Sequence, residues 1–148
     1  MSRSDLYTRL LYARRSRFFG KTAYYVLKLL GAEVPLPVRI GEGCLLVHGG
    51  YGLVVHPNTT LGDRVKLYPG VTLGRADIHR PASESAFEGI VVGDDVILSP
   101  GAKVLGKRGL LRIGAGAVIG ANAVVLEDVG AEEIWAGIPA RRVGIRKK

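Results

Sequence analysis

The residues best suited to acid–base chemistry in this 148-residue chain are its three histidines, at positions 48, 56 and 79. The ordinary pKa of histidine lies near neutral pH, so a neutral imidazole can accept a proton from a substrate hydroxyl. His48 is followed by Gly49 and Gly50, which have no side chains to cover it. We therefore take His48 as the first candidate for a general base.

The other two histidines have less distinctive surroundings. His56 precedes Pro57 and Asn58, a pair typical of an ordinary bend. His79 is followed by Arg80 in a segment rich in charged residues. We consider His56 only as a second site histidine, and we consider His79 as a residue that could contact a substrate.

The elements that must position these residues follow from a six-residue period. Six residues correspond to one short strand and one bend, and three such sides close a triangular coil whose aliphatic residues point inward. The period therefore predicts an all-β repeat, a parallel β-helix in which each coil stacks on the next. The aliphatic positions fall into three phased blocks: Val55, Leu61, Leu67 and Leu73; Val92, Leu98 and Val104; Ile113, Ile119 and Val125.

The period breaks at three places, and insertions in such a repeat become surface loops that commonly build the binding face. The first break lies between Leu46 and Val55, the second covers residues 75–89, and the third lies around residues 107–110. His48 falls in the first break, and the second contains the His79-Arg80 pair.

The chain begins with a different pattern, in which apolar residues alternate with Arg and Lys over residues 5–30. This pattern predicts helical structure that Gly20 bends or divides and that Gly31 ends. We divide the chain into a helical segment, 1–31, and a β-helix domain, 32–148. The helical segment would either cap the open end of the prism or rest on a membrane as a basic amphipathic helix.

Composition excludes several classes of protein. The net charge is +8, but no nucleic-acid-binding motif accompanies the basic residues, so we expect no nucleic acid partner. The single cysteine, Cys44, excludes a disulfide within the chain and fits a reducing compartment. We find no apolar run of about 18 residues and no signal peptide, so we expect a cytoplasmic protein.

Four motifs resemble the serine acetyltransferase family: VHGGYG at 47–52, VVHP at 54–57, GVTLG at 70–74 and AGIPAR at 136–141. The resemblance extends over roughly residues 32–144 and includes short relatives that accompany polysaccharide biosynthesis. It implies a hexapeptide-repeat acyltransferase built on a left-handed parallel β-helix. It also implies a homotrimer whose active sites lie between neighbouring subunits, with acetyl-CoA as cosubstrate and no metal.

The resemblance also implies roles for individual residues. His48 occupies the catalytic position, and Glu33 falls where the family usually has an Asp that orients the histidine. The His79-Arg80 pair corresponds to an Arg-His pair that helps bind the acceptor. Two arginines in the last coil would meet the phosphates of coenzyme A. The residues expected along the cofactor are Gly74, Ser99, Pro100, Gly120, Ala121, Arg141 and Arg142.

The chemistry agrees with this resemblance. Acetyl transfer to an alcohol needs a base that takes the hydroxyl proton as the oxygen attacks the thioester, and such a base contributes about 10² to 10⁴ in rate. A carboxylate on the other ring nitrogen fixes the tautomer and stabilises the imidazolium. His48 and Glu33 would supply these two groups.

Two departures from the family concern the acceptor. The family has a large N-terminal helical domain, where this chain has only about 30 residues. The family also has an acidic residue directly before the catalytic histidine, and this chain has Val47 there. An ammonium group without a carboxylate partner is poorly compensated. We therefore expect a hydroxyl of a sugar or polysaccharide precursor as acceptor; serine O-acetylation in cysteine biosynthesis is the alternative.

Two alternatives belong to other classes of protein. One is a trimeric β-helix metalloenzyme, because left-handed β-helix carbonic anhydrases bind zinc through three histidines across a subunit interface. The spacing of the three histidines here does not resemble that family's. The other alternative is a non-catalytic scaffold that uses its flat faces for assembly and does not bind coenzyme A.

Overall fold

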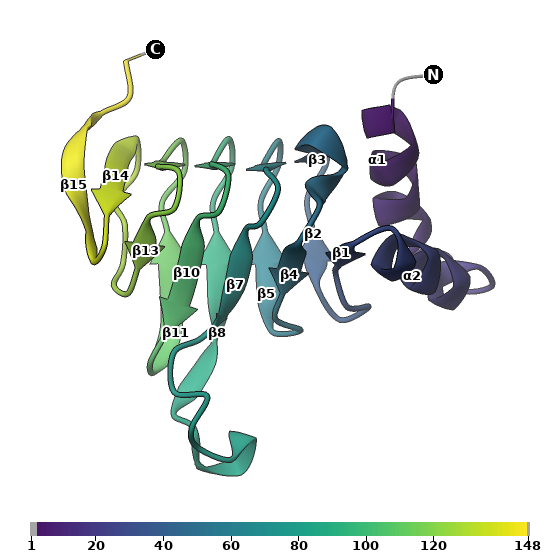
Figure 1. Cartoon of the computed structure of the whole chain (residues 1–148), viewed down its shortest axis with the longest axis horizontal. Coiled ribbons are helices and arrows are strands. Elements are labelled where there is room, and N and C mark those ends of the chain that lie inside the picture. Colours follow the sequence, from purple (N-terminus) through teal and green to yellow (C-terminus); the bar gives the residue numbers. More distant parts are fainter. Residues whose placement is uncertain (1–2, 148) are drawn as a thin grey trace.

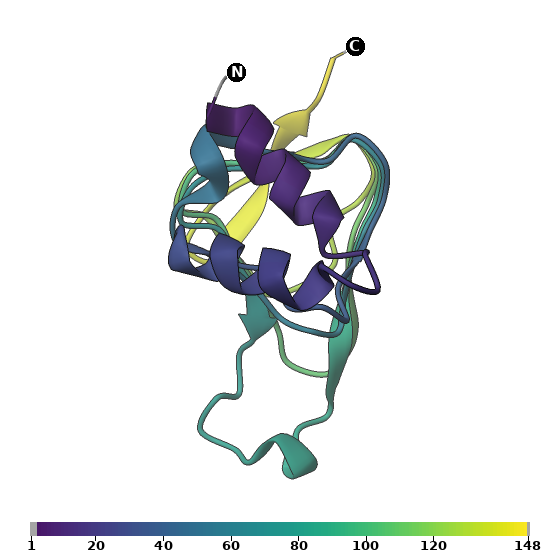
Figure 2. The ribbon, with the colours of Figure 1, turned by 90° about the vertical axis from the view of Figure 1, so that its right-hand side faces the viewer.

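Short parallel strands wind into a triangular coil with two helices across one end (Figures 1 and 2). The structure is a computed structural model that describes residues 3–147; residues 1, 2 and 148 lie outside the described part. It confirms the predicted left-handed parallel β-helix with an N-terminal helical segment.

Three sheets form the sides of the prism, and strands that follow one another in a sheet come from successive coils. The first sheet contains β1 (Ala32–Glu33), β4 (Leu53–Val55), β7 (Thr72–Arg75), β10 (Lys103–Gly106) and β13 (Val124–Val125). The second contains β2 (Arg39–Ile40), β5 (Thr59–Leu61), β8 (Phe87–Val92) and β11 (Gly109–Ile113). The third contains β3 (Leu45–Leu46), β6 (Lys66–Leu67), β9 (Ile97–Leu98), β12 (Val118–Ile119), β14 (Glu133–Gly137) and β15 (Ala140–Ile145).

The core is a set of aliphatic columns inside the prism. Leu67 pairs with Leu98 and Leu98 with Ile119, so the residues of one phase lie directly above one another. All three side chains are fully buried. Each buried aliphatic side chain stabilises the fold by about 1.5–3 kcal/mol, which explains why the six-residue spacing recurs so strictly.

The last coil ends differently from the others. Strand β15 runs antiparallel to β14, and Trp135 pairs with Arg142 in this hairpin. Trp135 is buried, and its indole N–H donates to Glu133. The hairpin therefore closes the C-terminal end of the prism, where a further parallel coil would otherwise stack.

The N-terminal segment forms two helices, α1 (Arg3–Ala13) and α2 (Gly20–Leu29). A Cβ at Gly20 would lie 2.5 Å from the Arg14 carbonyl oxygen, so only glycine fits where the chain turns between them. After α2, Gly31 takes a φ of +97°, as a helix-ending residue often does. The predicted division at Gly20 and end at Gly31 are both confirmed.

The helices cover the open end of the prism (Figure 2). Leu11 of α1 and Leu27 of α2 are fully buried and belong to the same hydrophobic core as the coils. The segment therefore caps the open end of the prism, which is one of the two roles that the sequence predicts for it. Among the described residues, no helix is long and apolar enough to cross a membrane.

All three breaks in the period form surface loops. The first forms the short helical turn η1 (Val47–Gly50), and the second forms a long loop that includes η2 (Ala82–Glu84) and projects from the prism (Figure 1). The third is the turn between β10 and β11. The second and third pack together, since Gly109 N–H donates to the Ala86 carbonyl at 2.7 Å.

Candidate functional site

His48 lies in the η1 turn, at the corner where the chain passes from the third sheet to the first. Its φ is +51°, and Gly49 and Gly50 follow at +79° and +61°. Such left-handed conformations cost a non-glycine residue energy, and in a run they are accessible mainly to glycine. The turn leaves the His48 side chain exposed, with its ring edge-on to Tyr68 and 6.3 Å between the two ring centroids.

Helix α1 packs against this turn. A Cβ at Gly49 would lie 2.9 Å from the ring of Tyr7, which is buried. The Tyr7 hydroxyl donates to the hydroxyl of Tyr51, at the end of the turn, at 3.3 Å. The cap helix therefore also holds the backbone that presents His48.

Small residues continue from Tyr68 along the same edge of the prism, which we call the His48 edge. Tyr68 N–H donates to the Leu98 carbonyl just before Ser99, and Asn122 N–H donates to the Pro100 carbonyl. These bonds place Tyr68, Ser99 and Gly120 at equivalent positions of successive coils, with Pro100 and Ala121 one residue further on. Four of the predicted cofactor residues therefore lie in line with His48: Ser99, Pro100, Gly120 and Ala121.

The two predicted phosphate-binding arginines lie near the far end of this edge. Arg141 pairs with Ala136 across the last hairpin, and Ala136 packs against Gly120. Arg141 forms an exposed ion pair with Glu127 at 2.9 Å. Arg142 pairs at 3.3 Å with Glu133, whose side chain is only 19% exposed. Exposed pairs are worth about 0–1 kcal/mol, so Arg141 could exchange its partner for a phosphate at little cost. Parallel strands are about 4.8 Å apart, so four coil steps separate His48 from Ala136 by about 19 Å.

A groove of about 630 Å³ lies on the outer face of the first sheet, and we call it the sheet groove. Its polar or charged lining residues are Glu33, His56, Thr72, Arg75 and Lys103, among apolar side chains that include Val54, Leu105 and Ile78. The predicted cofactor residue Gly74 also lines this groove, on β7. Gly74 is thus separated from the other predicted cofactor residues by the width of the sheet.

The expected hydrogen bond between Glu33 and His48 is not formed in this chain. The Glu33 carboxylate accepts from Lys28 Nζ at 2.7 Å and from the Tyr24 hydroxyl at 3.4 Å. The bond to Glu33 raises the pKa of Lys28. Within residues 3–147, no hydrogen bond joins Glu33 to His48, because α2 lies beside β1 and supplies its own partners to the carboxylate.

His56 lies in a more enclosed environment than its sequence neighbours predict. Its Nδ1 accepts the Asn58 backbone N–H at 3.1 Å, which leaves the neutral ring protonated at Nε2. The ring meets Phe87 edge-on, with 5.0 Å between centroids. Burial, together with the positive charge of Arg75, lowers the pKa of His56. Phe87 and Arg75 come from the two ends of the long loop, so no local sequence signal at His56 could reveal this environment.

The long loop carries a basic pocket of about 450 Å³, lined by Asp77, His79, Arg80, Lys107 and Arg108 among others. Arg75 fixes the loop, since its guanidinium donates to the Arg80 carbonyl at 2.7 Å and lies 3.7 Å from Asp77 Oδ1. Asp77 is only 14% exposed, and its Oδ1 has no hydrogen-bond partner among the described residues.

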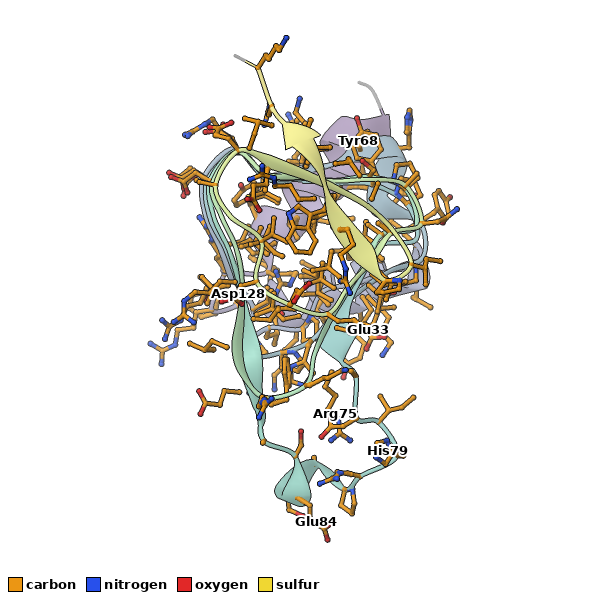
Figure 3. All side chains as sticks on the ribbon, turned by 90° about the vertical axis from the view of Figure 1, so that its left-hand side faces the viewer. Glu33, Tyr68, Arg75, His79, Glu84 and Asp128 are labelled. Carbon is orange, nitrogen blue, oxygen red and sulfur yellow. The ribbon has the colours of Figure 1, made fainter. Side chains whose placement is uncertain are left out.

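One chain does not bring the predicted acceptor residues together with His48. Figure 3 shows His79 on the projecting loop, on the other side of the prism from Tyr68, which contacts His48. Val47 is half-buried beside His48 and is therefore also far from the His79-Arg80 pair. Among the described residues, no group of three or more His, Cys, Asp or Glu lies close enough to hold a metal ion.

Sequence comparison matches this chain to serine acetyltransferases. No protein-family model matches the chain. A serine acetyltransferase of Bacillus licheniformis is 34% identical over 134 residues, which are 90% of this chain and 58% of that protein. Across the curated relatives that it matches, the chain spans from about a third to somewhat over half of their length.

Solved structures agree with the sequence comparison. Serine acetyltransferase from Brucella abortus, in complex with coenzyme A, has a TM-score of 0.75 at 26% identity, covering 97% of this chain and 55% of that one. The Neisseria gonorrhoeae enzyme in complex with serine has a TM-score of 0.71 at 28% identity, covering 91% of this chain and 54% of that one.

The environment of His56 predicts its titration. Its pKa should lie below the ordinary value of about 6.5, with Nε2 as the protonated nitrogen of the neutral form. Long-range proton–nitrogen NMR across a pH series measures both. Because the unfolded chain would then bind the proton more readily, acidification below about pH 6.5 should favour unfolding at this site.

The variant Arg75→Gln should raise the midpoint of the His56 titration, because it removes the nearby positive charge. Lys66→Gln, on the third sheet, removes a charge elsewhere and should leave the midpoint unchanged. A wild-type midpoint at or above 6.5, or a neutral ring protonated at Nδ1, would contradict this description of His56.

Proposed function

Since the chain is homologous over its β-helix to the serine acetyltransferases, a hexapeptide-repeat acyltransferase family, we propose that it transfers an acetyl group from acetyl-CoA to an acceptor hydroxyl. The observation that carries this proposal is the position of His48. Its exposed ring lies at the start of an edge built from small residues, and a relative of this fold has been solved with coenzyme A.

The reaction needs one proton to be moved twice. Neutral His48 accepts the proton of the acceptor hydroxyl while the oxygen attacks the thioester carbonyl carbon. The tetrahedral intermediate then collapses, the bond from carbon to sulfur breaks, and the imidazolium returns the proton to the departing thiolate. The products are the acetyl ester and free coenzyme A.

The small residues along the His48 edge suit an extended cofactor. Ser99, Pro100, Gly120 and Ala121 leave room for a pantetheine arm to lie flat against the prism and to bond with backbone groups. Arg141 and Arg142 supply positive charge about 19 Å from His48, where the phosphates of the same molecule would lie. Gly74 would contact the cofactor only from the sheet groove, across the width of the first sheet.

Glu33 is proposed as the residue that orients His48, but only after it changes partner. Its present bonds to Lys28 and Tyr24 are at the protein surface, and such exposed pairs are worth about 0–1 kcal/mol. Exchange of Lys28 for the imidazole would therefore cost little. A carboxylate on the ring would then hold the imidazole in one tautomer and stabilise the imidazolium.

The proposal includes a homotrimer with shared sites. His48 lies next to Tyr68 on one edge of the prism, and Figure 3 shows Tyr68 across the prism from His79 on the projecting loop. In an assembly of parallel prisms, one subunit's loop would lie beside the His48 edge of its neighbour. This arrangement completes a site that one chain leaves in two parts.

Serine is the acceptor that the relatives favour. The proteins matched here are named serine acetyltransferases, and one was solved with serine, whereas none of the comparisons supports the sugar acceptor expected from the sequence. That expectation rested on Val47, which stands in place of an acid, and on the short N-terminal helical segment. Asp77 offers a carboxylate in its place, beside Arg80, Lys107 and Arg108. An amino acid could then set its ammonium against Asp77 and its carboxylate against the guanidinium groups.

Replacing His48 tests the mechanism. His48→Ala should lower kcat by about 10² to 10⁴ and should change the affinity for acetyl-CoA little, because other residues line the cofactor edge. For the wild type, kcat/KM should rise with pH through a single ionisation, since only the neutral imidazole accepts a proton. A thiol-release assay measures both quantities.

An unchanged thermal midpoint would show that the His48→Ala variant still folds. If the variant kept near-normal turnover, His48 would not be the base. If the wild type bound coenzyme A but no acceptor produced turnover, the scaffold alternative would replace the enzyme. Stoichiometric zinc in the purified wild type would favour the metalloenzyme alternative instead.

An acceptor panel tests the proposed substrate. With serine, sugars and chloramphenicol compared at equal acetyl-CoA, serine should give the highest kcat/KM. Asp77→Asn should lower kcat/KM for serine by about tenfold or more, because an unpaired ammonium is costly. Glu84→Gln, in the same loop but outside the pocket lining, should have no effect. A sugar acceptor that outperforms serine and is insensitive to Asp77→Asn would restore the acceptor expected from the sequence.

A further inference from the structure

The outer surface of the cap carries several large apolar side chains. Phe18 and Phe19, in the turn before α2, are 85% and 71% exposed. Tyr25 and Leu29, on α2, are 61% and 87% exposed, and Val26 lies beside them at 38%. We call these five residues the cap patch. Clustered exposed side chains of this kind mark a surface that contacts something other than water.

The inner face of the same helix explains why the cap patch faces outward. Gly20, Ala23 and Leu27 are buried toward the prism at helical spacing. Tyr25, Val26 and Leu29 are exposed and lie elsewhere around the helix. The cap and membrane roles considered for this segment are therefore not exclusive, because the helix has one apolar face for the prism and another that no described residue covers.

The charge around the cap patch is strongly positive. Residues 1–31 hold seven Lys or Arg and one Asp, so they carry a net charge of +6 out of the chain's +8. Arg15 and Lys28 are engaged in ion pairs with Glu42 and Glu33. Arg17 and Lys21 are exposed next to the two phenylalanines, and within residues 3–147 neither forms an ion pair.

We propose that the cap patch docks the protein on an anionic membrane surface. The aromatic and aliphatic side chains would enter the boundary between headgroups and acyl chains, while Arg17 and Lys21 pair with lipid phosphates. Each basic residue near such a surface adds attraction that weakens with salt. A proposed trimer of parallel prisms would present three patches at the same end, which strengthens binding without any new contact.

Charge distinguishes an anionic membrane from the two other partners that an apolar, basic surface could bind, which are a second copy of the chain and nucleic acid. A second copy of the same end would bring the exposed Arg17 and Lys21 against their own counterparts, which is repulsive at contact. Nucleic acid would satisfy the charge but would leave the apolar side chains of the cap patch unused. An anionic lipid surface satisfies both features, and the docking does not depend on the proposed acetyl transfer.

The test is cosedimentation of the full chain with lipid vesicles, which needs no enzyme assay. Phosphatidylcholine vesicles with about 30% phosphatidylserine should bind the protein at low salt, pure phosphatidylcholine should bind it far less, and salt should weaken the binding. The double substitution Phe18→Ser and Phe19→Ser should weaken binding by about tenfold or more. Lys21→Glu should weaken it less and should remove part of the salt dependence.

Two matched controls lie away from the cap. Val143→Ser removes an exposed apolar side chain at the opposite end of the prism, and Lys66→Glu makes the same charge change on the third sheet. Both should bind like the wild type. The proposal is overturned if anionic vesicles bind no better than neutral ones, or if the control variants lose as much binding as the cap variants. It is also overturned if light scattering shows that the phenylalanine substitutions dissolve a larger oligomer while the wild type fails to bind vesicles.

Discussion

The structure depends on the stacking of coils in register. Each coil places its aliphatic residues directly above those of the last one, as Leu67, Leu98 and Ile119 do, and parallel hydrogen bonds hold the spacing near 4.8 Å. A residue inserted within a strand would shift every following side chain by one face. Insertions are therefore confined to the corners, and His48, the long loop and the turn at Lys107 all occur at such corners.

The same register would let a thin prism bind the long cofactor proposed for it. Equivalent corner positions of successive coils form a straight line, so small residues at Ser99 and Gly120 repeat along one edge without any long-range design. His48 is brought to the start of that line by a turn that only glycines at positions 49 and 50 can follow, and Tyr7 of the cap fills the space beneath. The cap thus supports the site on its inner side and leaves an apolar surface on its outer side.

The period of six was sufficient to predict the coil, its buried positions and the three loops. Aliphatic residues that must avoid water repeat every six positions in the coils, and the loops lie where this repeat is interrupted. The division of the helices at Gly20 followed from its sequence as well. The contacts of side chains were not predictable. Glu33 bonds to Lys28 because α2 happens to lie beside β1, and His56 owes its environment to Phe87, about 30 residues away in sequence. The antiparallel β15 was missed because its residues do not repeat the period. Nothing in the sequence around Asp77 indicates that the folded loop half-buries its carboxylate beside Arg75.

The proposed mechanism requires that the His48 edge holds the cofactor with its reacting sulfur beside the histidine. A crystal structure of the protein with coenzyme A measures this directly. We expect the pantetheine arm to follow Ser99, Pro100, Gly120 and Ala121, the phosphates to lie near Arg141 or Arg142, and the sulfur to be within reach of a His48 ring. Coenzyme A bound elsewhere, with its sulfur beyond the reach of every His48 in the assembly, would show that this edge is not the cofactor site.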